Sequence, residues 1–303
     1  MARGRVKFSP PKENSGQSVT MHPVLSTYLF VNRKLSAALV GEVARAHVSA
    51  IELFCSRGHF DYQSAEDGRE LASWLSGNNL TLHSIHAPTT RDSYPRRESG
   101  TPLLVSDPER IRRQEAVDEI KRALDLVESV SFRYCVVHVE RTRDIPDQRR
   151  WDAAFSSLEL LSLFARQRGV TIALENTPGD MATPANLKNF LEQTRLTNVK
   201  LCFDAGHAHL EGGVVPSLEV IRDLIVTTHI HDNRGERDDH LPPYDGTIDW
   251  ESALAAMPAG IPFVFELKEP AAAIGSSDVQ AFAATLEGMR SVFEKFERTL
   301  TQG

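Results

Sequence analysis

Eight short runs of apolar and β-branched residues alternate with longer segments of helical periodicity between Val24 and Leu267. Such alternation is typical of repeated βα units, in which a helix follows each strand. A doubly wound open sheet alternates in the same way, but a count of eight strands favours closure into a barrel. The sequence therefore predicts an α/β fold, a single (β/α)8 TIM barrel with its active site at the C-terminal ends of the strands. The expected strands cover residues 24–30, 49–55, 80–86, 134–140, 170–176, 199–205, 225–231 and 261–267.

The chain is predicted to hold one domain preceded by a tail. Residues 1–22 combine four basic residues with Pro, Ser and Gly and contain no apolar core of a secretory signal. We therefore expect a disordered or loosely attached tail over residues 1–22 and the barrel over residues 23–303. Regular patterning begins directly after Met21, so one hypothesis is that translation starts there. No Pro/Gly/Ser-rich linker interrupts the alternation, so no internal domain boundary is expected.

Composition limits the partners that the chain is expected to have. Apolar residues make up 41% of the sequence, and no apolar run approaches the roughly 18 residues of a membrane span. The net charge of −7 disfavours nucleic acid without excluding it, because a local basic groove is compatible with a negative total. Cys55, Cys135 and Cys202 lie in apolar segments without disulfide spacing, which fits a reducing cytoplasm. The sequence leaves homo-oligomerisation open.

Charged and imidazole side chains gather at the ends of the predicted strands, where buried parallel strands are expected to be almost continuously apolar. Successive strand residues point to opposite faces, so residues two apart share a face: His138 with Val136, Glu175 with Ala173, Asp204 with Cys202, His229 with Thr227 and Glu266 with Val264. They are therefore expected to point into the mouth of the barrel, above an apolar layer. The strand-end residues are His86, His138, Glu140, Glu175, Asp204, His229, His231 and Glu266.

Converging carboxylates repel one another unless a cation compensates their charge. A divalent metal ion neutralises them and accepts both oxygen and nitrogen ligands. A single histidine or aspartate at a strand end is more often a hydrogen-bonded structural group than a ligand, but the joint pattern on four consecutive strands favours metal binding. The predicted ligands are Glu175, Asp204, His229 and Glu266.

Six phrases of the sequence resemble the xylose isomerase-like barrel superfamily, which includes sugar isomerases, ketose epimerases and the apurinic-site endonuclease family. They are SIHAP at 84–88, ALENTPG at 173–179, FDAGHAH at 203–209, HIHDN at 229–233, DDHLPPYDGTIDW at 238–250 and FELK at 265–268. The resemblance covers essentially the whole chain from Val24. In the isomerase and epimerase branch it implies one divalent metal ion on Glu175, Asp204, His229 and Glu266. The ion would be Mn, Zn, Co or Mg, with Zn or Mn favoured.

The endonuclease branch implies a larger metal centre. Its three zinc ions use further ligands that resemble five positions of this chain. The residues after HAP, TTRDSYP, depart from that branch, and DDHLPPYDGTIDW is closer to the isomerase branch. Additional metal or substrate binding is therefore assigned to His86, His138, His207, Asp238 and His240.

The resemblance implies a metal-dependent isomerase or epimerase of a sugar, sugar phosphate or polyol, with a small carbohydrate as its partner. Glu175 and Glu266 would be the catalytic residues, moving a proton next to a carbonyl through an enediolate. A multi-zinc phosphodiester hydrolase like the apurinic-site endonucleases is the alternative, and a non-catalytic metal-binding barrel is the third hypothesis. Glu52 is interpreted equally well as a residue of the site and as a hydrogen-bonded carboxylate of the core. His231 is expected above the mouth of the barrel. Neither loop 89–102 nor loop 141–149 identifies the substrate.

Overall fold

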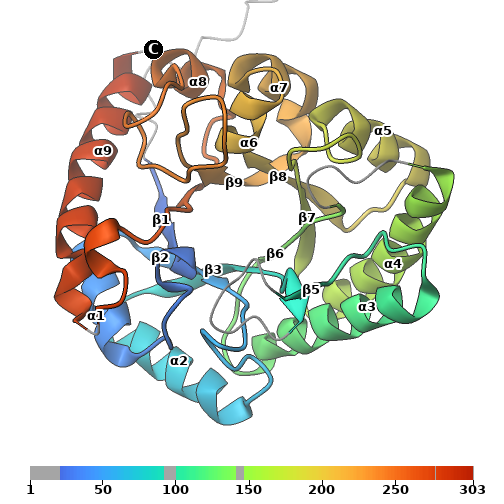
Figure 1. The fold of residues 1–303 in the computed structure, drawn as a ribbon, viewed down its shortest axis with the longest axis horizontal. Coiled ribbons are helices and arrows are strands. Elements are labelled where there is room, and N and C mark those ends of the chain that lie inside the picture. Colours follow the sequence, from blue (N-terminus) through green and yellow to red (C-terminus); the bar gives the residue numbers. More distant parts are fainter. Residues whose placement is uncertain (1–20, 92–99, 141–146, 277, 303) are drawn as a thin grey trace, which may run out of the picture.

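The computed structural model describes residues 21–91, 100–140, 147–276 and 278–302. Within these residues, eight parallel strands close into a barrel in the order β1-β10-β9-β8-β7-β6-β3-β2, surrounded by helices (Figure 1). The predicted (β/α)8 TIM barrel is confirmed. The barrel strands are β1 (Pro23–Ser26), β2 (Ala50–Phe54), β3 (Thr81–His86), β6 (Tyr134–Val137), β7 (Thr171–Glu175), β8 (Val199–Asp204), β9 (Ile225–Ile230) and β10 (Phe263–Phe265).

Helices cover the outside of the barrel because each has one apolar face. In α4, Leu158, Leu161 and Ala165 recur at helical spacing and are fully buried, while Leu160 on the other face is exposed. At the start of α5, the hydroxyl of Thr183 accepts a hydrogen bond from the backbone N–H of Asn186, and a proline occupies the first turn. The helices are α1 (Ala37–Arg45), α2 (Ala65–Gly77), α3 (Arg110–Leu124), α4 (Gln148–Gln167), α5 (Pro184–Thr194), α6 (Ala205–Leu210), α7 (Val214–Ile221), α8 (Trp250–Ala256) and α9 (Ala283–Gln302).

All eight barrel strands are shorter than the runs predicted for them, and β1 and β6 end three or more residues early. The first strand ends at Ser26, whose hydroxyl accepts a hydrogen bond from the backbone N–H of Tyr28 and begins a 3-10 helix over Thr27–Phe30. β6 ends at Val137, so His138 and Glu140 follow the strand instead of ending it. Both differences move the chain out of the sheet at the C-terminal edge, where the loops around the mouth begin.

The interior of the barrel changes from apolar to polar along the strands. Val136, Ala173 and Cys202 form a small buried cluster of their own, separate from the larger core between strands and helices. Glu175 and Asp204, each two residues further along its strand, are also buried. The polar groups therefore lie above an apolar layer, as the alternation predicts. All three cysteines of the chain are buried and unpaired.

The loops around the mouth include a short hairpin of β4 (Thr90–Arg91) and β5 (Thr101–Pro102). The rest of loop 89–102, residues 92–99, and residues 141–146 of loop 141–149 lie outside the described residues. The same holds for residues 1–20 of the expected tail, whereas Met21 is buried in the core. Among the helices that the structure describes, none has the length and apolarity of a membrane-spanning segment.

Candidate metal centre

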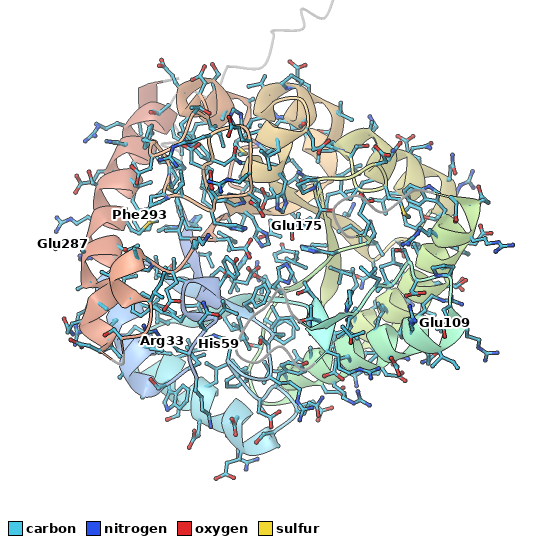
Figure 2. The ribbon with its side chains drawn as sticks, viewed as in Figure 1. Arg33, His59, Glu109, Glu175, Glu287 and Phe293 are labelled. Carbon is cyan, nitrogen blue, oxygen red and sulfur yellow. The ribbon has the colours of Figure 1, made fainter. Side chains whose placement is uncertain are left out.

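Four side chains predicted to bind a metal ion lie together at the mouth of the barrel: Glu175, Asp204, His229 and Glu266. Glu175 and Asp204 are the last residues of β7 and β8, His229 lies near the end of β9, and Glu266 directly follows β10. The parallel register places Asp204 directly opposite His229. One oxygen or nitrogen atom from each of the four residues lies within 4.8 Å of the others, and all four side chains are buried. Figure 2 shows Glu175 near the centre of the barrel opening, far from the outer residues Glu109 and Glu287.

Several polar atoms of this central group approach one another without forming hydrogen bonds. Nδ1 of His229 lies 3.2 Å from Oε2 of Glu266, 3.3 Å from Oε2 of Glu175 and 3.8 Å from Oδ2 of Asp204. Nevertheless, His229 Nδ1, Glu175 Oε1 and Glu266 Oε1 are buried without a hydrogen-bond partner among the described residues. Buried polar atoms are almost always satisfied in folded proteins. A divalent cation would satisfy these atoms together, so the residues fit a metal ion.

Electrostatics keep two carboxylates of the central group, Glu175 and Asp204, ionised. Burial alone raises the pKa of Glu175, but the positive charges of His138 and His229 outweigh it and bring the pKa well below its ordinary value. Burial also raises the pKa of Asp204, and the charges of His207 and His231 likewise lower it below the ordinary value. Metal ligands must be deprotonated, so both carboxylates are in the ligand form.

A second group shares Glu175 with the central one. Nε2 of His138 lies 3.0 Å from Oε2 of Glu175, and Nε2 of His86 lies 3.3 Å from the same oxygen. The two imidazole nitrogens are 3.2 Å apart. His86, His138 and Glu175 thus offer three ligand atoms that converge on one point.

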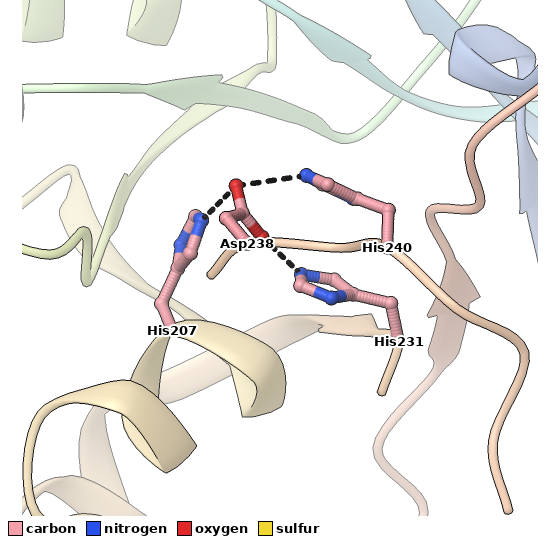
Figure 3. A group of neighbouring side chains, drawn as sticks. All are labelled: His207, His231, Asp238 and His240. Atoms are coloured by element: carbon pink, nitrogen blue, oxygen red, sulfur yellow. Dashed lines mark hydrogen bonds and ion pairs between the residues drawn. The ribbon is translucent and has the colours of Figure 1, made fainter. Parts of the chain in front are cut away.

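A third group surrounds Asp238 (Figure 3). Oδ2 of Asp238 lies 3.0 Å from Nε2 of His240 and 3.3 Å from Nε2 of His207. Nε2 of His231 lies 3.8 Å from Oδ1 of the same carboxylate. Burial raises the pKa of Asp238, but the charge of His240 and the hydrogen bond from His207 lower it far below the ordinary value. Three imidazoles and a carboxylate are a ligand set typical of zinc.

We expected His231 above the mouth of the barrel, but this prediction is wrong. The side chain is fully buried, and its Nε2 lies 3.0 Å from Oδ2 of Asp204. A Cβ added at Gly206 would come within 2.0 Å of the ring, so the space for His231 depends on that glycine. His231 therefore contacts both the central group and the third one. The His-x-His alternation of 229 and 231, which puts both on one face, was the signal for this position.

Asp232 holds the loop that carries the third group. Its Oδ1 accepts hydrogen bonds from the backbone N–H groups of Asn233 (2.9 Å) and Ile248 (3.1 Å). Its Oδ2 accepts from the backbone N–H of Tyr244 (3.0 Å) and from the indole of Trp250 (2.8 Å). One buried carboxylate thus ties together both ends of the segment that presents Asp238 and His240.

Glu52 of β2 lies inside the barrel next to the central group. Its oxygens are 3.1 and 3.3 Å from Nε2 of His229, and Oε2 accepts a hydrogen bond from the hydroxyl of Ser84 at 2.8 Å. Burial raises the pKa of Glu52, but the charge and hydrogen bond of His229 lower it below the ordinary value. Glu52 is therefore a hydrogen-bonded carboxylate in the core, and its contact with His229 also joins it to the central group.

All three groups border one cavity of about 950 Å³ at the mouth of the barrel. Glu175, Glu266 and Asp238 are among the residues that line it, and its lysine and arginine side chains among the described residues are Lys268 and Arg237. The size is that of a small-molecule site.

Known proteins share the fold and the sequence pattern. A family model described as xylose isomerase-like TIM barrel matches residues 40–292. The uncharacterized protein y4fM of Sinorhizobium fredii is 30% identical over 211 residues, or 62% of this chain and 66% of that protein. A crystal structure of a D-tagatose 3-epimerase-like protein has a TM-score of 0.76 at 19% identity, covering 93% of this chain and 99% of that one. The IOLI protein, solved with a zinc atom, has a TM-score of 0.72 at 17% identity, covering 93% and 98%. At such identities the two solved structures show a common fold.

Proposed function

The chain belongs to the xylose isomerase-like TIM barrel family, and on this premise we propose that it is a metal-dependent isomerase or epimerase of a carbohydrate. The observation that carries the proposal is the pair of buried carboxylates, Glu175 and Glu266, which face one cavity and each offer an oxygen to the same four-residue group. A small-molecule carbohydrate is the proposed substrate class, in keeping with the D-tagatose 3-epimerase-like protein of the same fold.

Glu175, Asp204, His229 and Glu266 would hold the ion, and the mixture of carboxylate and imidazole suits Zn or Mn. A bound divalent ion supplies a Lewis acid that polarises a carbonyl and so acidifies the neighbouring C–H bond. Fold alone does not establish such chemistry, because one barrel supports many reactions. The donor set and the unpartnered buried atoms are what support it here.

Glu175 and Glu266 are proposed to exchange the proton at the carbon next to the carbonyl, one removing it and the other returning it. They approach the cavity from β7 and from the end of β10, on different sides of the central group. His207 is placed to orient a substrate hydroxyl, since it lines the cavity and its Nδ1 lies 3.2 Å from Oε1 of Glu175. His86 and His138 support Glu175 from the other side, holding its Oε2.

The test uses NMR to detect the incorporation of solvent deuterium next to the carbonyl, with metal-loaded protein and a panel of ketoses and aldoses. Glu175→Gln and Glu266→Gln should each slow exchange by at least about 100-fold, the usual contribution of a general acid or base. Glu211→Gln, at the exposed rim of the same cavity, is the matched control and should keep wild-type exchange. Retained turnover in either of the first two variants removes the two-carboxylate scheme.

A second candidate function is multi-metal hydrolysis of a phosphodiester, and a specific observation favours it. The three ligand groups are contiguous, since Glu175 belongs to two of them and His231 connects Asp204 to Asp238. Adjacent metal ions stabilise the attacking and leaving oxygens of a displacement. Elemental analysis separates the candidates: about three tightly held zinc ions with incision of an abasic oligonucleotide would replace the isomerase proposal, whereas one exchangeable ion supports it.

A further inference from the structure

His229 presents its two ring nitrogens to different surroundings. Nδ1 faces the oxygens of Glu175 and Glu266 at 3.3 and 3.2 Å and has no hydrogen-bond partner among the described residues. Nε2 faces the opposite way, toward both oxygens of Glu52 at 3.1 and 3.3 Å. A neutral imidazole carries its proton on one nitrogen and a lone pair on the other. The group at Nε2 therefore decides whether Nδ1 can bind a metal ion.

Glu52 is fully buried, and its hydrogen-bond partners leave it only the role of acceptor toward the ring of His229. Its Oε2 already accepts the hydroxyl hydrogen bond of Ser84, also fully buried, so the carboxylate is fixed in place. An ionised carboxylate accepts hydrogen bonds and donates none. Nε2 of His229 must therefore be the donor in this contact, and in the neutral imidazole that binds a metal ion the lone pair is then on Nδ1.

We propose that Glu52 is a positioning residue, which keeps the proton of His229 on Nε2 and thereby directs the Nδ1 lone pair to the metal ion. The inference rests on the proposed function, because it takes the central group to bind a divalent ion. A carboxylate behind a ligand histidine orients the ring and increases its basicity, and removing such a partner commonly costs about 10-fold to 100-fold in metal affinity.

The surroundings of Glu52 argue against a purely structural role. Among the described residues it forms no ion pair with a lysine or arginine, and its hydrogen bonds join it to His229 and Ser84. Its neighbours along the strand, Ile51 and Leu53, are fully buried apolar residues. An apolar side chain of similar volume fills such a position without the desolvation cost of a carboxylate. The contact with His229 is what offsets that cost.

The experiment compares metal binding by wild type, Glu52→Gln and Glu52→Leu. Glu42→Gln is the matched control, since Glu42 is a buried carboxylate on α1 that contacts Arg45 and Gln280, away from the mouth. Metal-free proteins are titrated with Zn²⁺ in the presence of a competing chelator, and the Co²⁺ forms are compared by visible absorption. Circular dichroism of each metal-free protein reports whether it is folded.

Glu52→Leu should bind Zn²⁺ about 10-fold to 100-fold more weakly than wild type and give an altered Co²⁺ spectrum. Glu52→Gln should lose less affinity, because its amide oxygen still accepts from Nε2 without the charge. Glu42→Gln should match wild type in both measurements. If both Glu52 variants keep the wild-type affinity and Co²⁺ spectrum, this inference is overturned and the proposed function is not. If both metal-free Glu52 variants fail to fold, the inference is also overturned, because Glu52 then has a structural role. A wild-type protein that binds no divalent ion overturns the proposed function and this inference together.

Discussion

Nδ1 of His229 lies 3.2 Å from Oε2 of Glu266, although the two atoms form no hydrogen bond. Both side chains are buried, and each would be costly to leave unsatisfied in the barrel interior. The same nitrogen approaches Glu175 and Asp204, so three carboxylates surround one ring nitrogen. This arrangement is stable when a divalent cation accepts all four groups, and the predictions below follow from it.

Metal ions should stabilise the folded protein. An ion that binds only the native state, at a free concentration 100 times its dissociation constant, adds about 2.7 kcal/mol to the free energy of unfolding. Adding Zn²⁺ or Mn²⁺ to metal-free protein should therefore raise the thermal midpoint measured by calorimetry. Asp204→Asn removes a central ligand and should show a smaller rise, whereas an equal rise in this variant would place the binding elsewhere.

Gly206→Ala should destabilise the protein and displace His231. The added Cβ would lie 2.0 Å from the imidazole of His231, and overpacking of this kind costs about 1–3 kcal/mol. Urea unfolding measures the loss. Gly288→Ala in α9 is the matched control, since nothing lies within 4 Å of its added Cβ and alanine favours a helix by up to about 1 kcal/mol. Equal stability of the two variants would show that the space around His231 is not tight.

Trp250→Phe should loosen the loop that carries Asp238 and His240. It removes the indole hydrogen bond to Oδ2 of Asp232, and hydrogen bonds to charged groups contribute about 1.5–3 kcal/mol. We expect a loss of about 2 kcal/mol in urea unfolding, with weaker binding of metal ions beyond the first. Trp151→Phe, at a half-buried ring that stacks on Phe190, is the control and should cost less. A loss no larger than that of the control would contradict the role of Asp232 as the anchor.

His59 should make the protein less stable in mild acid. Burial lowers its pKa from 6.5 to about 4, so the unfolded chain binds a proton between these values that the folded chain does not. The free energy of unfolding should therefore fall as the pH drops below about 6.5, with about 2 kcal/mol lost from this residue at about pH 5.

The check for His59 is urea unfolding of wild type and His59→Asn at about pH 7.5 and about pH 5. Asparagine can keep the hydrogen bond that Nδ1 donates to the carbonyl of Arg33 at 2.6 Å in the native protein, but it does not titrate. The variant should lose about 2 kcal/mol less than wild type over this range. The same loss in both proteins would assign the acid sensitivity to other groups.

The barrel was predictable because its strands are continuous apolar runs that end in polar residues, as at Glu175 and Asp204. Register in a parallel sheet brings such ends to one edge, so proximity of the central group follows from the pattern alone. Strand ends were less predictable. The run from Val24 to Phe30 is mostly apolar, and its pattern does not show that the hydroxyl of Ser26 caps a 3-10 turn and ends the strand.

The rest of the site depends on contacts that a linear pattern does not contain. The place of His231 is decided by its contact with Asp204 and by the close approach of Gly206, which lies 25 residues away in sequence. The position of Asp238 depends on a loop held by the side chain of Asp232. The role of Glu52 was ambiguous in the sequence, because its partner His229 is 177 residues later and comes close only when the barrel closes.

The most direct test of the central claim is a crystal structure of the metal-loaded protein, with anomalous scattering measured on both sides of the metal's absorption edge. The account predicts an anomalous peak bound by Glu175, Asp204, His229 and Glu266, with Nδ1 of His229 about 2.0–2.1 Å from a zinc ion. Further peaks between His86 and His138, or beside Asp238, would give the number of ions and favour the hydrolase. A loaded crystal with no peak among the four central residues would contradict the account.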